Sequence, residues 1–533
     1  MARSSVFALS ALLLCTSAAP GLSAADLALG SALAANLCGQ GEGKAAAASN
    51  GASAVLVPGL TPAHIDVSTN SMAQAFFDQG LGQLFGFDYD EALKSFQRAA
   101  TLDADCALCL WGQSLALGPY INSGPIPAET IARARALTGA ALANGNLTGR
   151  NRALVEAAHA RYAPGGSKDG VHGDRYADTM TALAASAPLD DLTAIMAAEA
   201  IMTSQPWDYW QAGGKQPKAR AGTALALVDT VLARSPNHPQ AIHLLIHLTE
   251  ASADPARAAG PAARLGGIAP GAPHMVHMPS HTWYRIGRFA DAITANKAAV
   301  AADEAYARAV GADPKYYGYF NHHTHFLASA ATQNGDRATA LAAADALEAA
   351  LQPAALARSP WREMLLVTAL QARVNFLSPT EVLALPRPGK RSRQLTLAWH
   401  GVRAEALAMS GQPDAAEAEL KALRKVRDQL QQRGMSGSNS FAAIAEGVAR
   451  GRIAAARGDI PAALSAFAAA EAIDAKLPYQ EPPLWPIPVS VLSGQLRLAQ
   501  GDTAGAAADF RRALVQRPGL RLASDGLAQI AKA

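Results

Sequence analysis

Long apolar runs, clusters of one charge and aromatic side chains are all scarce in this chain of 533 residues. Beyond the N-terminal segment no stretch of about 20 apolar residues occurs, so we expect no membrane-spanning helix in the mature protein. The 46 basic and 43 acidic residues form no basic stripe with interleaved aromatics, which argues against a nucleic-acid partner. Aromatic residues make up only 6% of the chain, which disfavours a sheet-rich fold, whereas abundant alanine suits closely packed helices.

Cysteine is also rare, and two common catalytic signatures are missing. The chain has four cysteines, with a single C-x-x-C pair, which excludes a four-cysteine zinc site. Neither a G-x-S-x-G nucleophile motif nor a phosphate-binding P-loop occurs. Cys106 and Cys109 lie near the start of an expected helix, and Leu110 follows them where a haem-attachment motif has histidine. We expect a local disulfide between Cys106 and Cys109, with copper ligation and a redox role as the alternatives.

The N-terminus has the pattern of a secretory signal peptide. Arg3 precedes an apolar run over residues 6–14, and small residues lead to Ala24 and Ala25. We therefore assign residues 1–25 to a signal peptide and expect a soluble exported protein, periplasmic or secreted. Residues 26–60 are rich in alanine, glycine and serine, which predicts a flexible lead-in.

A short signature recurs along the rest of the chain. A glycine is followed by a polar or basic residue, an aromatic or apolar residue, and an alanine five positions after the glycine. Clear copies are Gly287–Ala292, Gly458–Ala463 and Gly501–Ala506. The glycine permits a tight turn between two helices, and the small residues let those helices touch. Because such a pair buries its apolar face only by stacking on neighbours, the sequence predicts an all-α solenoid, with one part over residues 61–350 and a continuation over residues 351–533.

Histidines recur at matched places relative to this signature. Counting back fifteen residues from Ala258, Ala292 and Ala340, which close the signature in three consecutive repeats, gives a histidine each time. Counting back eleven or eighteen residues gives further histidines in two of the three repeats. The set comprises seven of the chain's 13 histidines, namely His243, His247, His274, His277, His281, His322 and His325. Because stacked repeats place equivalent residues side by side, we predict a histidine cluster in space.

A cluster of imidazoles suits a transition-metal ion. Imidazole nitrogen binds zinc, copper, iron or nickel, and the scarcity of nearby carboxylates favours copper or zinc. Because an exported protein meets copper readily, we favour copper slightly, with zinc second. Ligation requires neutral imidazoles, so metal occupancy should fall below about pH 6.5. Pro279 stands between His277 and His281, which predicts either a helix that starts at this proline or a kink.

Glu250 and Tyr284 are the candidate catalytic residues. Glu250 follows His243 and His247 on one expected helix face, where a carboxylate serves as a ligand, as a partner that orients an imidazole, or as a general base. Tyr284 is one of five aromatic residues that flank the cluster and could wall a substrate pocket; the others are Trp283, Tyr316, Tyr317 and Tyr319. The leading hypothesis is a metal-binding protein, and a metal-dependent oxidoreductase if it is an enzyme. A pH-sensitive or structural polar network and a groove for an acidic peptide are the alternatives that the residues leave open.

Four motifs accompany the repeats: Cys106–Gly112, Pro206–Trp210, His277–His281 and Asn321–Phe326. With the repeats they resemble tetratricopeptide-repeat (TPR) proteins over residues 70–520, and more narrowly a bacterial family of exported TPR proteins. This resemblance implies a right-handed TPR-type solenoid whose first helices line a concave groove, so that the histidine cluster faces the groove. It also implies a second function, a TPR scaffold that binds a peptide or protein partner without catalysis, and it leaves room for a small-molecule ligand in the groove.

Overall fold

The computed structural model describes residues 54–166, 170–316, 319–351, 360–389, 392–432, 439–477 and 479–532. The predicted signal peptide, most of the predicted lead-in, Cys15, Cys38 and Tyr317 lie outside these residues. Within these ranges no β-strand occurs, although an isolated bridge joins Trp210 and Pro217. None of the described helices is both long and apolar enough to cross a membrane.

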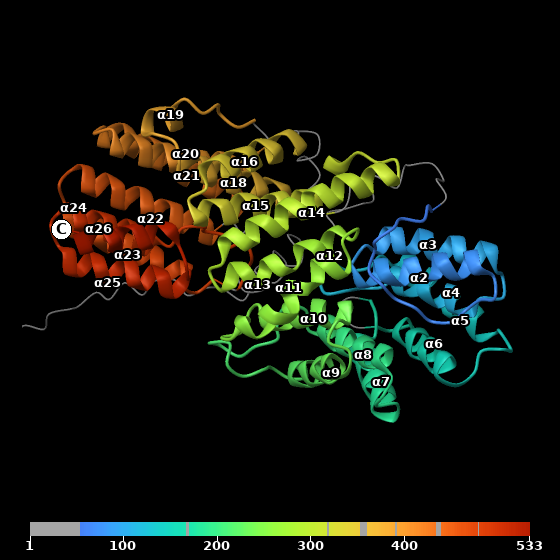
Figure 1. Ribbon diagram of the computed structural model, residues 1–533. Helices are drawn as coiled ribbons and strands as arrows, with labels where there is room; N and C mark the ends of the chain where they lie inside the picture. Colours follow the sequence, from blue (N-terminus) through green and yellow to red (C-terminus); the bar gives the residue numbers. More distant parts are fainter. Residues whose placement is uncertain are drawn as a thin grey trace, which may run out of the picture.

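The helices form three consecutive groups that follow one another across the molecule (Figure 1). The first group contains α2 (Ser71–Phe85), α3 (Tyr89–Leu102), α4 (Ala107–Ala116), α5 (Ala128–Leu142), α6 (Gly149–Arg161), α7 (Gly173–Ser186), α8 (Asp191–Ser204) and α9 (Ala221–Arg234). The middle group contains α10 (Pro239–Thr249), η2 (Pro255–Ala258), α11 (Ala259–Ile268), α12 (Pro273–His277), α13 (Pro279–Arg285), α14 (Phe289–Ala309), η3 (Pro314–Tyr316), α15 (Phe320–Asn334) and α16 (Arg337–Ala350). The third group contains α18 (Pro360–Val374), α19 (Pro379–Leu383), α20 (Arg393–Met409), α21 (Pro413–Gln432), α22 (Asn439–Ala456), α23 (Ile460–Asp474), α24 (Val489–Ala499), α25 (Thr503–Gln516) and α26 (Arg521–Lys532).

Consecutive helices pack as pairs joined by short turns, as the recurring signature predicts. The pairs α2 with α3, α15 with α16, α20 with α21, and α22 with α23 are among the most extensively packed. At the turn between α15 and α16, Gly335 has φ +75°, a left-handed conformation that glycine adopts at little cost. The next residue, Asp336, caps α16, because its carboxylate accepts a hydrogen bond from the backbone N–H of Thr339 at 3.1 Å. The signature thus encodes both the turn and the start of the second helix, and the predicted all-α helical solenoid is confirmed.

Small residues allow close helix contact within a repeat. The buried ring of Phe96 on α3 lies against Gly80 on α2 and Gly112 on α4. A Cβ atom at either glycine would come within 3.0 Å of that ring. The ring of Phe96 therefore fits against both helices, because each helix has a glycine at the contact and so carries a hydrogen atom where other residues have Cβ.

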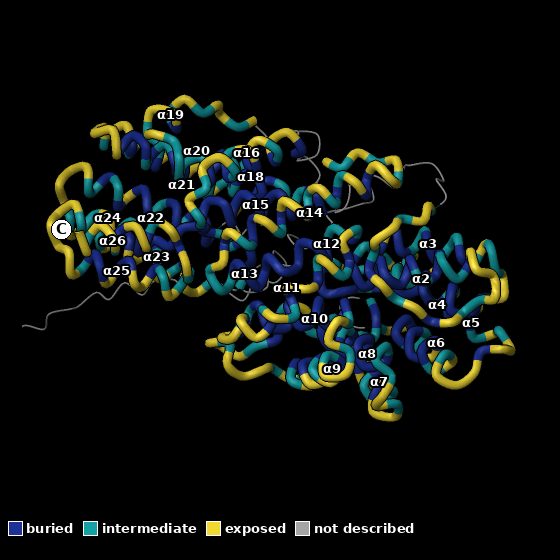
Figure 2. Tube along the Cα trace, viewed as in Figure 1, coloured by how far each residue is buried: buried dark blue, intermediate teal, exposed yellow. Residues whose placement is uncertain are grey.

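Segments from both ends of the chain fold over the middle group. The side chain of Gln83 on α2 donates to the hydroxyl of Tyr306 on α14 at 2.7 Å. On the other side, Gln333 on α15 donates to the carbonyl of Pro486. Figure 2 shows α10, α12, α13 and α15 as largely buried. The histidine side chains are therefore buried among chain segments that are distant in sequence, and their place in a concave groove stays a prediction.

The largest hydrophobic cluster crosses the expected boundary between the two parts of the solenoid. It runs from Ile65 to Val489 and includes Leu347 and Leu351 on one side of the boundary and Met364 beyond it. The division into residues 61–350 and 351–533 stays a prediction of the sequence.

Candidate metal centre

Four helices of the middle group carry the histidines. Each helix except α15 begins with a proline, which lacks the N–H that a first-turn residue would leave unpaired. Helix α10 presents His243 and His247, α12 presents His274 and His277, α13 presents His281, and α15 presents His322, His323 and His325. Helix α12 ends at His277 and α13 starts at Pro279, which is the first of the two outcomes expected for that proline. Met278, between the two helices, keeps helical dihedral angles of φ −51° and ψ −37°.

Six of the seven predicted histidines form two groups of three. The first triad is His243, His247 and His274, and the second triad is His277, His281 and His322. Within each triad one ring nitrogen per residue lies within 4.8 Å of the others. All six side chains are buried, at most 4% exposed. The predicted cluster exists, and it consists of two neighbouring sets that could each hold a metal ion.

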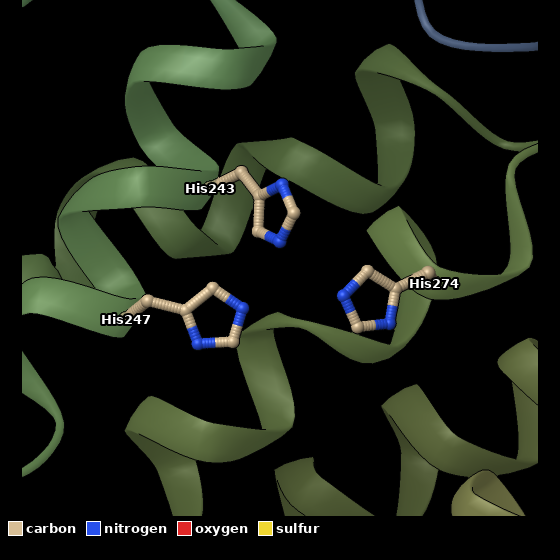
Figure 3. A group of neighbouring side chains, drawn as sticks. All are labelled: His243, His247 and His274. Carbon is tan, nitrogen blue, oxygen red and sulfur yellow. The ribbon is translucent and has the colours of Figure 1, made fainter. Parts of the chain in front are cut away.

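In the first triad the three rings surround a common space. Figure 3 shows the Nε2 atoms of His243, His247 and His274 pointing into that space. The Nδ1 of His243 faces the carbonyl oxygen of Phe85 at 2.8 Å, and the Nδ1 of His247 faces a carboxylate oxygen of Glu250 at 2.7 Å. Carbonyl and carboxylate oxygens accept hydrogen bonds, so both Nδ1 atoms carry the proton and both Nε2 atoms carry a lone pair. Neither Nε2 atom has a hydrogen-bond partner among the described residues.

The second triad follows the same plan. The Nδ1 of His277 lies 2.6 Å from Oδ1 of Asn296, whose amide group is oriented by donation to the carbonyl of Ala292. The Nδ1 of His281 donates to Glu250 at 2.7 Å. The Nε2 of His277 then lies 2.9 Å from the Nε2 of His281 and 3.1 Å from the Nε2 of His322. The Nε2 atom of His277 therefore lies so close to two other ring nitrogens that facing lone pairs would repel each other. A proton or a cation between the nitrogens removes this repulsion.

Glu250 links the two triads. One carboxylate oxygen accepts from His247 of the first triad, and the other accepts from His281 of the second triad. The hydroxyl of Tyr479 also donates to this carboxylate, at 2.9 Å. Among the roles considered for Glu250, the geometry fits an orienting partner, because the carboxylate lies behind both rings at their Nδ1 atoms.

The surroundings oppose protonation of three of the histidines. Burial, followed by the neighbouring imidazoles, lowers the pKa of His274, His277 and His322 well below the ordinary value. Burial alone would raise the pKa of Glu250, but the attraction of His281 and the hydrogen bonds from both histidines outweigh it, so the pKa is lowered. The three imidazoles whose pKa values are lowered are thus in the neutral state that metal ligation needs.

His325 lies apart from both triads. Its Nε2 contacts the hydroxyl of Thr368 on α18 at 2.8 Å, and it belongs to no group of potential ligands found among the described residues. The hydroxyl of Tyr284 is hydrogen-bonded to the hydroxyl of Ser329 at 2.9 Å and not to a ring nitrogen of either triad. Burial raises the pKa of Tyr284 to about 12.

Cys106 and Cys109 are joined by a disulfide at the start of α4.

Two of the flanking aromatic residues approach a triad or a cavity. Tyr319 stacks on His274 with ring centroids 4.4 Å apart. Tyr284 lines a cavity of about 440 Å³ together with Arg285, Tyr479 and Glu481. This cavity lies next to the second triad, because Glu481 approaches the Nδ1 of His281 at 3.6 Å. The side chain of Tyr316 lies outside the described part of the structure.

Several residues of the site have no counterpart in the sequence prediction. His323, beside His322, has its ring centroid 4.5 Å from that of His277, and its Nδ1 contacts Asp303 at 2.6 Å. The run Asn321–His325 contains this residue, so a search for adjacent histidines would have found it. Asn296 and Asp303 lie on α14, the partner helix, where the histidine pattern gives no signal.

Comparison with known proteins gives no family. No family model matches the chain, and no curated protein matches it. A solved structure of IFIT1, a monomeric mutant with Gppp-AAAA, is 12% identical, with 89% of each chain covered and a TM-score of 0.35. Yeast Tom70 is 13% identical, with 87% of this chain and 96% of that chain covered and a TM-score of 0.27. The TPR domain of P58(IPK) is 12% identical, with 86% of this chain and 97% of that chain covered and a TM-score of 0.21. Inferences about function therefore rest on the residues of this chain.

Proposed function

We propose that this protein is an exported metalloprotein that binds a transition-metal ion through the second triad, with copper favoured over zinc. One observation carries the proposal: the Nε2 atoms of His277, His281 and His322 meet in a buried space. The Nδ1 protons of His277 and His281 are already directed to Asn296 and Glu250. In the neutral rings the Nε2 lone pairs of His277 and His281 therefore face each other, and a cation between them converts this repulsion into ligation.

The distances support a shared ion. Two nitrogens that each lie about 2.0 Å from one ion are about 2.8 Å apart at a right angle and about 3.3 Å apart at the tetrahedral angle. The two Nε2 contacts of His277, at 2.9 Å and 3.1 Å, fall between these values. Each Nδ1 anchor further fixes its ring and makes the Nε2 atom a better donor.

A structural polar network is the competing explanation. In such a network one proton would bridge two Nε2 atoms. The Nε2 of His277 approaches two other Nε2 atoms, and a single proton satisfies only one of those contacts. In addition, burial and the neighbouring rings lower the pKa of both His277 and His322, which opposes the protonation that the network requires. A metal ion satisfies all three nitrogens at once.

The ligand chemistry favours copper or zinc. Three imidazoles without a thiolate suit either ion, and a four-coordinate ion held by three protein ligands keeps one position for an outside ligand. Copper supplies one-electron redox chemistry, so a metal-dependent oxidoreductase is the enzymatic form of this proposal. The cavity of about 440 Å³ beside Glu481 and Tyr479 borders the Nδ1 side of His281 and not the Nε2 atoms that would hold the ion.

Recognition of an acidic peptide by the histidines has less support. Both triads are buried, so they present no surface that a peptide could contact. Partner binding elsewhere on the helical array would be independent of the triads.

Metal analysis of the mature chain, purified without a histidine tag, tests the proposal. After removal of metal and reconstitution with Cu²⁺ or Zn²⁺, we expect stoichiometric binding that is weakened by His322→Ala. The matched control is His325→Gln, which also replaces a buried histidine of α15 but should leave binding unchanged. A chain that retains no ion after reconstitution would refute the proposal, and so would equal binding by the His322→Ala variant and the native chain.

A further inference from the structure

Beyond the ion proposed for the second triad, we infer that the first triad binds a second transition-metal ion and that Glu250 couples the two sites. This inference rests on the proposed function, because it extends the same chemistry to a neighbouring set of imidazoles. The first triad offers the same ligand type and the same burial as the second.

The ligand atoms of the first triad are prepared for a cation. His243 and His247 direct their Nδ1 protons to oxygen atoms and leave their Nε2 lone pairs in the common space (Figure 3). His274 completes the set, and neither of its ring nitrogens has a hydrogen-bond partner in the described part of the chain. Buried polar atoms without partners are costly. A metal ion removes that cost for three Nε2 atoms together.

The turn between α2 and α3 closes this triad from outside. The carbonyl of Phe85 anchors His243, and the ring of Phe87 lies over all three imidazoles, with centroid distances of 4.4 Å to His243, 5.7 Å to His247 and 5.6 Å to His274. Phe87 is fully buried and has φ +57°, a left-handed conformation that is unfavourable for an aromatic residue. Strained backbone of this kind clusters at ligand sites, where the surrounding structure holds it in place.

Room for a further small ligand exists beside His274. A cavity of about 30 Å³ is lined by His274, Asp303 and Tyr319. This volume accommodates about one water molecule.

Coupling follows from the shared carboxylate. Glu250 accepts from His247 through one oxygen and from His281 through the other, each at 2.7 Å. A leucine at this position has no acceptor atom, so it can orient neither of the two rings. Asn296, in contrast, contacts only His277 of the second triad. Replacement of Glu250 should therefore affect both ions, and replacement of Asn296 should affect one.

Equilibrium dialysis of the mature chain against buffered Cu²⁺, with ions counted per chain, tests the inference. We expect two ions in the native chain and in His325→Gln, and one ion in both His274→Ala and His322→Ala. We expect Glu250→Leu to weaken the binding of both ions by about 10–100-fold, and Asn296→Leu to weaken the binding of one of them by that factor.

The outcomes separate the two proposals. If the native chain binds a single ion that persists in His274→Ala and is lost in His322→Ala, the second ion is refuted and the proposed function stands. If no ion binds, both fail. If Glu250→Leu weakens the binding of only one of two ions, the coupling is refuted. Circular dichroism verifies the fold of each variant, and the ion counts of His274→Ala and His322→Ala decide the stoichiometry without the Glu250 variant.

Discussion

Replacement of His325 by glutamine should make the metal-free protein more resistant to acid. His325 is 3% exposed and its Nε2 contacts Thr368. Burial lowers the pKa of this imidazole from 6.5 to about 3. Between these two values the unfolded chain binds a proton at His325 and the folded chain does not. The stability contributed by the neutral ring is therefore present above about pH 6.5 and is lost as the pH falls toward 3.

The size of this effect follows from linkage. At pH 5 the unfolded imidazole is almost fully protonated, whereas the folded one is almost fully neutral. The difference amounts to a loss of about 2 kcal/mol in the free energy of unfolding between pH 7 and pH 5. Glutamine does not titrate, so the His325→Gln variant should lose about 2 kcal/mol less than the native chain over this interval.

Urea unfolding of both proteins at pH 7 and pH 5, in the presence of a chelator, measures this double difference. The other histidines contribute equally to both proteins and cancel. His64→Gln is the matched control, because hydrogen bonds to Asp78 and Asp66 raise the pKa of the exposed His64. His64 therefore stabilises the fold below its unfolded pKa, and its replacement should shift the pH dependence in the opposite direction. Identical pH dependence of the native chain and His325→Gln would refute the reasoning.

Two packing predictions use the same unfolding assay. Phe87→Ala should lower the free energy of unfolding by about 3–5 kcal/mol, because it leaves a void over the first triad; a loss below about 1 kcal/mol would contradict the placement of that ring. Gly451→Ala should cost about 1–3 kcal/mol, because its Cβ would lie 2.3 Å from the ring of Phe467. Gly145→Ala is the control, since its Cβ would meet no described atom within 4 Å, and equal costs at both glycines would exclude this close contact.

The helix pairs were predictable because their determinants are local. A glycine that turns the chain, an aspartate that caps the next helix and alanines at the contact all lie within six residues, as at Gly335 and Asp336. The closure over the middle group was not predictable in this way. It depends on contacts such as that of Tyr479 with Glu250, which lie 229 residues apart.

The histidine register predicted the cluster but not its division. The turn between each histidine-bearing helix and the alanine that closes the signature differs in length from repeat to repeat. Residues 250–254 separate α10 from η2, whereas only residues 335 and 336 separate α15 from α16. A fixed offset therefore reaches different helix faces. This explains why His325 points to Thr368 while His243 points into the first triad. The orienting group Asn296 lies on α14, where no histidine pattern exists, so no signal in the sequence pointed to it.

X-ray absorption spectroscopy of the copper-loaded mature chain tests most directly whether the converging Nε2 atoms hold a metal. We expect about three imidazole ligands per ion at about 2.0 Å, with fewer imidazoles when His274 and His322 are both replaced by alanine. A spectrum without imidazole scattering, or one that this double replacement leaves unchanged, would contradict the assignment of the two triads as metal sites.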